Sequence, residues 1–276
     1  MSRITLNLIP ILLASSLAAC AVHQPNFVNK RAAGQPASAH IKPVQHAMDL
    51  LLPLRESDQR TVEDVLQDFG PYAVNQLKPY FAQAGVAYPP REITLVALKA
   101  ERKLELWARD EREYRLIRNY DIRAASGTAG PKLRQGDRQV PEGVYRIVGL
   151  NPNSNYHLSM KLNYPNEFDQ FHAALEGRHN PGSDIFIHGK ADSIGCLAMG
   201  DDAIDELFVL VAQAGMENVK VVIAPYDSRS QPLNPDADGM PKWADQLYGM
   251  ITREIQALNQ PMTISSTNPL IQPRPR

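Results

Sequence analysis

The chain has little cysteine, no excess of either charge and no long apolar run after its first twenty residues. Its two cysteines are Cys20 and Cys196. The net charge of −1 comes from 29 Lys and Arg against 30 Asp and Glu, so charge gives no reason to expect nucleic acid as a partner. No later run approaches the roughly 18 apolar residues that indicate a membrane-spanning helix. The 276 residues, 43% of them apolar, are enough for one sizeable core or two small ones.

The first nineteen residues have the pattern of a secretory signal. Arg3 precedes a short apolar run that ends Leu17-Ala18-Ala19-Cys20. This ending resembles the lipobox of bacterial lipoproteins, in which cleavage precedes a cysteine whose thiol then carries a diacylglycerol. An ordinary cleaved signal followed by a chance cysteine is the alternative. Because Ala21 follows in place of an aspartate, the resemblance implies a periplasmic protein anchored in the inner leaflet of the outer membrane.

The interpretation of Cys196 depends on whether Cys20 is acylated. If Cys20 is acylated, Cys196 is the remaining thiol of this chain, in a compartment where cysteines normally pair. An intramolecular disulfide is then impossible. Such a thiol is either buried and inert or kept for its reactivity, and the residues around it have to decide.

Changes in periodicity divide the chain into six segments. We predict a signal peptide (1–19), a lipidated cysteine with a flexible tether (20–45), a helical segment (46–91), a mostly β domain (92–226), a loop with a closing helix (227–258) and a disordered tail (259–276). The expected fold class is therefore α+β, with helices flanking the β-rich part.

Apolar residues at helical spacing mark the helices. One face of the first helix holds four of them: Val62, Val65, Leu66 and Phe69. Gly70-Pro71 predicts a break, after which a second helix begins. Further helices are predicted from about Asp201 and over 243–258, and 168–181 is interpreted as a loop. Alternating residues predict strands at 93–98, 104–107, 114–117, 144–148, 156–162, 185–188 and 219–224.

One segment carries the residue types of a nucleophilic enzyme. The apolar strand 185–188 ends in His188, a loop of small and polar residues follows, and Gly195-Cys196 comes eight residues after the histidine. A nearby imidazole can take the proton of a thiol and stabilise the thiolate. Gly195 lets the backbone bend so that amide groups can point at an oxyanion. A histidine at a strand end beside a buried structural cysteine is the alternative.

The same segment, with its His-Gly followed by Ser-x-Gly-Cys, resembles the signature of the L,D-transpeptidase (YkuD-like) catalytic domain. Blocks in the expected order precede it: Gly130-Pro131-Lys132, the stretch 136–145 and the stretch 151–159. The resemblance covers about 93–224. It implies an enzyme that acts on peptidoglycan stem peptides, with no cofactor and no metal.

The resemblance also implies a role for each residue of the signature. Cys196 corresponds to the nucleophile that forms a thioester, and His188 to its base. The backbone carbonyl of Gly189 would orient the imidazole, Ser193 would support the loop, and amides at Gly195 and Cys196 would form the oxyanion hole.

Two departures from the common signature leave the reaction open. Ile194 and Ala198 stand where many members have histidine and arginine or asparagine, and the loop between His188 and Cys196 is short. Both features resemble a subgroup of murein L,D-transpeptidase-like proteins that includes a hydrolase releasing lipoprotein from peptidoglycan. Transpeptidation, hydrolysis of a peptidoglycan-linked lipoprotein, and non-catalytic peptidoglycan binding are therefore the three hypotheses.

Other polar residues are weaker candidates. His157 and Ser159 share the polar face of strand 156–162 and could bind substrate, although a solvated sheet face is the alternative; Tyr156 falls with the core residues. Asp137 and Glu142 could contact a cationic diaminopimelate centre or lie in solvated turns. His172 and His179 lack the further ligands that a zinc site would need: suitably spaced Cys, His or carboxylates.

Overall fold

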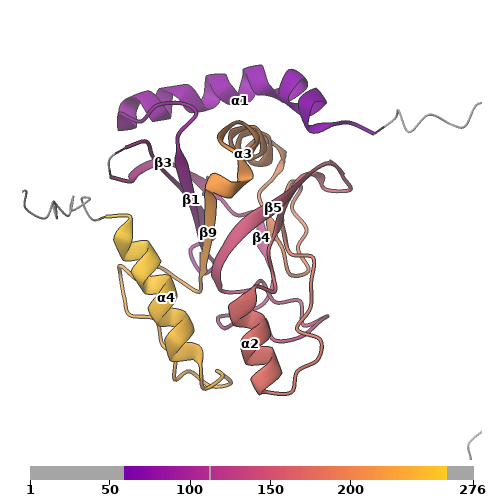
Figure 1. The fold of residues 1–276 in the computed structure, drawn as a ribbon, viewed down its shortest axis with the longest axis vertical. Helices are drawn as coiled ribbons and strands as arrows, with labels where there is room; N and C mark the ends of the chain where they lie inside the picture. Colours follow the sequence, from indigo (N-terminus) through magenta and orange to yellow (C-terminus); the bar gives the residue numbers. More distant parts are fainter. Residues whose placement is uncertain (1–58, 112, 260–276) are drawn as a thin grey trace, which may run out of the picture. The chain divides into compact units, whose positions relative to one another are not determined.

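The computed structural model describes residues 59–111 and 113–259, which belong to one compact unit (Figure 1). Over these residues it has nine β-strands in one mixed sheet and four α-helices, which confirms the predicted α+β class. Within that part of the chain, no helix is long and apolar enough to span a membrane. Several predictions fall outside the described residues. They are the signal peptide, the lipidated Cys20, the tether, residues 46–58 of the predicted helical segment, and the tail from residue 260.

The sheet has the order β3-β2-β1-β9-β5-β6-β7-β8-β4. Its strands are β1 (Glu92–Leu98), β2 (Lys103–Arg109), β3 (Arg115–Asp121), β4 (Ala124–Ala125), β5 (Gly143–Ser154), β6 (His157–Leu162), β7 (Phe186–His188), β8 (Leu197–Ala198) and β9 (Val219–Ala224). All seven predicted strands are present. The two that were missed, β4 and β8, have two residues each, too few for alternation to show.

The first helix is continuous, so the predicted break at Gly70-Pro71 is wrong. Helix α1 runs over Val62–Ala84 and contains both Pro71 and Pro79. A proline removes the hydrogen bond to the carbonyl four residues earlier. Here those carbonyls belong to Gln67 and Asn75, which are exposed, so water can satisfy them.

The predicted loop at 168–181 is also wrong in its first half, because α2 occupies Glu167–Leu175. The Asn166 side chain accepts a hydrogen bond from the Asp169 amide, and the Asp169 carboxylate accepts one from the Asn166 amide. This reciprocal capping box is readable in the sequence as Asn-x-x-Asp. Helices α3 (Asp201–Ala214) and α4 (Ala244–Ala257) lie where they were predicted.

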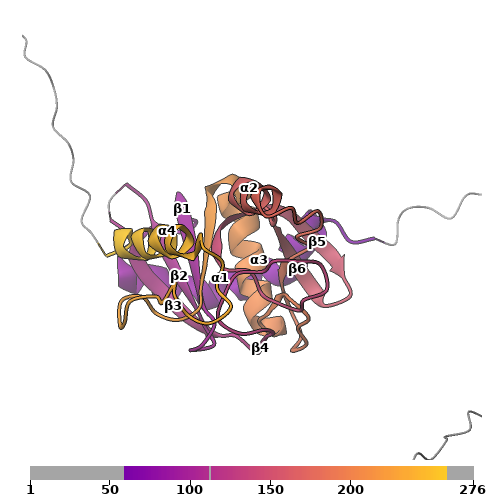
Figure 2. The same ribbon diagram turned by 90° about the horizontal axis from the view of Figure 1, so that it is seen from below.

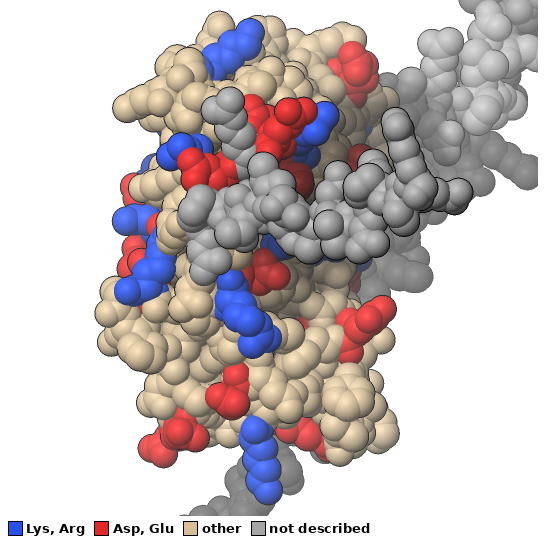
Figure 3. All heavy atoms as spheres, turned by 60° about the vertical axis from the view of Figure 1, so that its left-hand side comes forward, with Lys and Arg blue, Asp and Glu red and all other residues tan. Residues whose placement is uncertain are grey.

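The sheet is covered on two sides by helices. In β1, Leu95 and Ala97 belong to the core cluster that includes α1 and α3, whereas Val96 and Leu98 belong to the one that includes α4. Figure 1 shows α1 lying across α3 on one side and α4 on the other, and Figure 2 gives the view from below with α2 and α4 toward the reader. Acidic and basic side chains are interspersed on the face drawn in Figure 3, in keeping with the balanced charge.

Candidate active site

The parallel pair β7–β8 brings the histidine and the cysteine to one face of the sheet. His188 pairs with Ala198, and continuing this register by two residues places Cys196 beside Phe186. Alternate residues of a strand share a face, so all three of His188, Phe186 and Cys196 project to one side. With strands about 4.8 Å apart and a rise of about 3.3 Å per residue, the Cα atoms of His188 and Cys196 are roughly 8 Å apart, which lets imidazole and thiol approach.

The imidazole of His188 is held in one orientation. Its Nδ1 lies 2.7 Å from the carbonyl oxygen of Gly189. A carbonyl can only accept, so Nδ1 carries the proton and Nε2 is left as the base. His188 is 2% exposed, and this burial lowers its pKa below the ordinary histidine value. The neutral imidazole that a general base requires is therefore the resting form.

Gly189 has to be glycine for this arrangement to exist. A Cβ at this position would lie 2.6 Å from both the Tyr156 carbonyl oxygen and Asp201 Oδ1. The backbone on either side is also fixed, since the Gly189 amide donates to the Leu158 carbonyl and the Met199 amide donates to the His188 carbonyl. The histidine is thus held by its neighbouring strands as well as by its own ring.

Cys196 is a free, half-buried thiol whose Sγ lies 3.9 Å from the Asp184 carbonyl oxygen. Burial raises the pKa of the Cys196 thiol, partly offset by a backbone hydrogen bond at Phe186 and by the Lys132 ammonium. With the pKa of the thiol raised and that of the imidazole lowered, the resting pair is neutral.

Ser193 is the centre of a hydrogen-bond network under the cysteine loop. Its Oγ donates to the Cys196 carbonyl at 2.7 Å and accepts from the amides of Ser126 at 3.2 Å and Gly195 at 3.4 Å. Gly195 has φ +124°, a backbone conformation that side-chain-bearing residues rarely adopt. This network holds the backbone before Cys196, as the supporting role proposed for Ser193 requires.

Both site residues open into one pocket of about 540 Å³, within the size range of peptide and small-molecule sites. It is lined by residues from three segments: Lys132, Gln135, Gly136 and Arg138; Tyr156; and Ser183, Asp184, Ile185, Phe186, His188, Asp192, Ile194 and Cys196. The thiol is therefore reachable from solvent, which an inert structural cysteine would not need to be.

Among the lining residues that were not predicted from the sequence are Tyr156, Lys132 and Arg138. Tyr156, expected in the core, is 37% exposed, and its ring lies 4.5 Å from that of His188. It stands just before β6, so the alternation of that strand does not extend to it. Lys132 and Arg138 lie in a loop without periodicity, where the pattern gives no direction to a side chain.

Two predicted substrate-binding residues do not line this pocket. His157 Nε2 lies 2.6 Å from Asp205 Oδ1, and its ring packs edge-on against Phe69 of α1. Ser159 is buried in the ladder opposite His188. His157 therefore packs against α1 and α3, and Ser159 pairs with the strand that carries His188.

The solvated-turn interpretation is wrong for Glu142, whereas Asp137 lies half-buried at a turn. Asp137 accepts hydrogen bonds from the Lys132 ammonium and from backbone amides of its own loop. Glu142 is 0% exposed and accepts from Lys99, the Gly130 amide and Tyr248. Each of the four carboxylate oxygens therefore already accepts at least one hydrogen bond within the protein.

No group of three or more His, Cys, Asp or Glu side chains over 59–111 and 113–259 is placed to hold a metal ion. His172 stacks on Trp243 with ring centroids 4.6 Å apart, a packing role in α2.

Sheet and pocket together define a cysteine–histidine site on an α+β domain. Residues 92–223 match the model of the YkuD family, the L,D-transpeptidase catalytic domain, so the resemblance predicted from the sequence is confirmed. The protein named "Putative L,D-transpeptidase YafK" is 39% identical over 133 residues in both Escherichia coli K12 and Escherichia coli O157:H7. The match spans 46% of this chain and 52% of the relative, so the chain spans about half the length of the curated relatives it matches.

Solved structures show a distant likeness. The helical cell shape determining protein Pgp2 of Campylobacter jejuni is 17% identical with a TM-score of 0.42, covering 66% of this chain and 77% of its own. Bd1075 of Bdellovibrio bacteriovorus is 22% identical with a TM-score of 0.37, covering 60% of this chain and 56% of its own. Similarity at this level carries no argument about function.

Proposed function

We propose that this protein is a cysteine acyl-transfer enzyme that acts on peptidoglycan stem peptides. The observation that carries the proposal is the oriented His188, which lines the same open pocket of peptide size as Cys196. The family match at 92–223 supports the same chemistry. The role of each residue follows from its contacts.

In the first half-reaction, His188 Nε2 takes the thiol proton as Cys196 Sγ attacks the peptide carbonyl carbon. The tetrahedral oxyanion lies at the Cys196 amide, because the Gly195 amide, predicted as the second donor, is directed at Ser193 Oγ. A hole donor of this kind typically contributes about 3 kcal/mol to catalysis. Collapse breaks the C–N bond, the leaving amine takes the proton from His188, and a thioester remains on sulfur.

The second half-reaction depends on what opens the thioester. An amine of another stem peptide gives a new peptide bond, and water gives a free carboxylate. Ile194, 73% exposed at the pocket, stands where many family members have histidine, and an exposed apolar side chain there offers no hydrogen bond to position an incoming amine. Hydrolysis of the thioester, including release of lipoprotein from peptidoglycan, is therefore the second candidate reaction.

We also propose that Cys20 carries the lipid that anchors the protein to the inner leaflet of the outer membrane, facing the periplasm. The Leu17-Ala18-Ala19-Cys20 sequence supports this placement, in which peptidoglycan lies within reach. Metabolic labelling with a fatty acid should modify the native chain and leave Cys20→Ala unlabelled.

Purified sacculi with and without bound lipoprotein separate the hypotheses. The protein is incubated with each, and the released or joined muropeptides are identified by mass spectrometry, with Cys196→Ala as the control. New cross-links indicate transpeptidation, and freed lipoprotein or shortened stems indicate hydrolysis. Sacculus binding with no change in any muropeptide would contradict the enzymatic proposal and favour a binding protein.

A further inference from the structure

We propose that the loop 131–139 carries a carboxylate-binding site, in which Arg138, with a spare N–H of Lys132, binds the terminal carboxylate of the peptide that Cys196 attacks. Both cations line the same pocket as the thiol. The inference deepens the proposed function and rests on it for the identity of the peptide. Its physical basis is a rigid loop that presents positive charge to the pocket.

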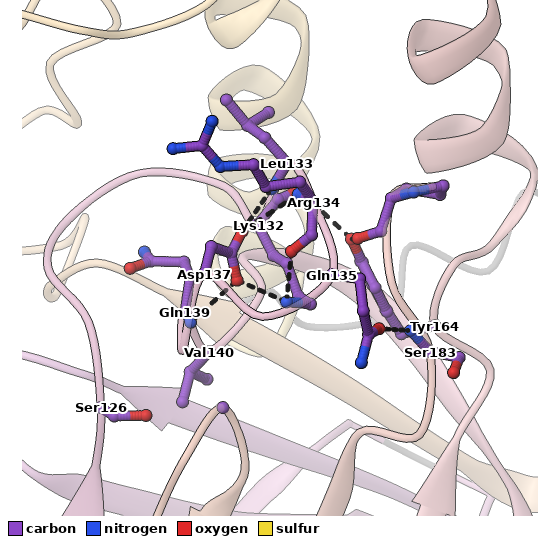
Figure 4. A network of polar contacts seen from close by, with 12 residues as sticks. Ser126, Lys132, Leu133, Arg134, Gln135, Asp137, Gln139, Val140, Tyr164 and Ser183 are labelled. Atoms are coloured by element: carbon purple, nitrogen blue, oxygen red, sulfur yellow. Dashed lines mark hydrogen bonds and ion pairs between the residues drawn. The ribbon is translucent and has the colours of Figure 1, made fainter. Parts of the chain in front are cut away.

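The loop is tied down from within. The Asp137 carboxylate accepts from the amides of Leu133, Arg134 and Gln139, and it pairs with the Lys132 ammonium. Figure 4 shows Lys132 and Asp137 pointing toward each other inside the loop. These nine residues form no helix or strand, and the half-buried Asp137 carboxylate holds them together instead.

The loop is also tied to the segment that leads into β7. The Tyr164 hydroxyl bridges the carbonyls of Lys132 and Pro181 at 3.2 and 2.8 Å, and the Gln135 side chain accepts from the Ser183 amide at 3.1 Å. Asp184, whose carbonyl faces the thiol, comes next in the chain. The position of the loop relative to Cys196 is therefore fixed by several independent contacts.

Arg138 is the cation that this loop leaves free. It is exposed and lines the pocket, and among residues 59–111 and 113–259 no carboxylate pairs with it. Its backbone has φ +55°, a left-handed conformation that disfavours any residue but glycine, asparagine or aspartate. A strained arginine held at the rim of a reactive pocket favours a functional role over a structural one.

Lys132 supplies the second cation. It is buried, and two of its three N–H groups are used, one by Asp137 and one by the Arg134 carbonyl at 2.9 Å. Gly182 keeps the space for it, because a Cβ there would lie 2.8 Å from Lys132 Cε. The third N–H has no partner among the described residues, and Lys132 reaches the pocket that holds Cys196.

The pocket lining holds two acidic residues, Asp184 and Asp192, and neither is paired with Arg138. Asp184 is paired with Lys161 and Ser183, and Asp192 lies on the loop after His188. An arginine forms two parallel hydrogen bonds to a carboxylate, so Arg138 suits a planar anion better than a neutral carboxamide. A peptide ending in a carboxylate is therefore the ligand class that this wall favours.

Binding to the full-length Cys196→Ala protein tests the inference without turnover. A stem tetrapeptide with a free terminal carboxylate is compared with the same peptide as its terminal carboxamide, by calorimetry. We expect the acid to bind at least tenfold more tightly than the amide. Arg138→Gln should remove this preference by weakening the acid alone, and Arg138→Lys should restore part of it.

Arg134→Gln is the matched control. Arg134 is an exposed arginine of the same loop, but its side chain lines a neighbouring cavity and not the pocket of Cys196. The variant should keep the preference for the acid. Equal affinity for the two peptides in the native loop, no binding of either peptide, or an equal loss in Arg138→Gln and Arg134→Gln would overturn the inference. Arg138-dependent binding without any change in sacculi would instead uphold the carboxylate site and refute the proposed reaction.

Discussion

At the residue scale, the site combines a buried base, His188, with a half-buried acid, the Cys196 thiol. Burial lowers the pKa of His188 and raises that of the Cys196 thiol, so each group favours its neutral form. A preformed thiolate–imidazolium pair would require both shifts to have the opposite sign. The thiol therefore loses its proton during attack on the substrate, and not before it.

Alkylation of Cys196 should follow this protonation state. In the full-length Cys20→Ser protein, the rate of reaction with iodoacetamide should still be rising at the alkaline end of the pH range, since burial raises the pKa of the thiol above its ordinary value. Stopped time courses from pH 6 to 10 measure it, with Cys196→Ser as the unlabelled control. A plateau reached near neutral pH would show a preformed thiolate and contradict the neutral resting pair.

Ser193 gives a second prediction at this scale. Ser193→Ala removes the partner of the Cys196 carbonyl and of the Ser126 and Gly195 amides. Unpaired buried polar groups of this kind cost about 1–3 kcal/mol each, and the loop that carries the nucleophile should shift. We expect kcat on muropeptides to fall at least tenfold under conditions in which urea unfolding shows that the variant is still folded. An unchanged kcat would show that the network does not position Cys196.

The residues proposed to be catalytic could be located from the sequence because their signature is local. Cys196, His188, Gly189, Gly195 and Ser193 all lie within nine consecutive residues. Tyr156, Lys132 and Arg138 reach the same pocket from separate segments, through strand pairing and loop contacts that no short stretch of sequence specifies.

At the element scale, periodicity predicted every strand of three residues or more and helices α3 and α4. It failed at α1, where Gly70-Pro71 was interpreted as a break although Pro71 faces solvent. It failed again at α2, where the helical signal lies in the Asn166–Asp169 capping box and not in an apolar stripe. Proline and short amphipathic segments are interpretable only once it is known which side of the helix is covered.

Helix α2 supplies a prediction about pH. Burial raises the pKa of Asp169, at the N-terminus of α2, to about 6, against about 3.9 for an unfolded aspartate. Between these values the folded chain binds the proton more tightly than the unfolded chain does. The contribution of Asp169 to stability therefore falls as pH rises from about 4 to about 6, by at most about 3 kcal/mol.

Urea unfolding of the native chain and Asp169→Asn at pH 4, 5, 6 and 7 measures this contribution. The variant loses its cap at every pH, but the stability of the native chain relative to the variant should be greatest at pH 4 and level off above about pH 6. A difference that is constant over this range, or that grows with pH, would contradict the raised pKa.

At the scale of the whole molecule, one buried carboxylate connects the sheet to the helix that covers it. Glu142 accepts from Lys99 at 2.9 Å, at the end of β1, and from the Tyr248 hydroxyl of α4 at 2.9 Å. Lys99 also donates to the carbonyls of Thr128 and Val140. The segment between Thr128 and Val140 contains the loop 131–139, which forms one wall of the pocket.

Glu142→Ala should therefore destabilise the entire domain. It leaves the Lys99 ammonium buried without its counter-charge, which typically costs about 3–5 kcal/mol. Glu254→Ala is the control, because its pair with Lys220 is about one-third exposed and should be worth about 1 kcal/mol or less. Similar unfolding midpoints for the two variants in urea would show that Glu142 is not structural.

The central claim of a covalent intermediate on Cys196 is tested most directly by trapping it. The protein is mixed with soluble muropeptides, quenched in acid during turnover, and analysed by intact mass and peptide mapping. We predict a mass increase equal to the acyl part of the stem peptide, located on Cys196 and removed by hydroxylamine. Turnover with an unmodified Cys196, or turnover retained in Cys196→Ala, would contradict the account.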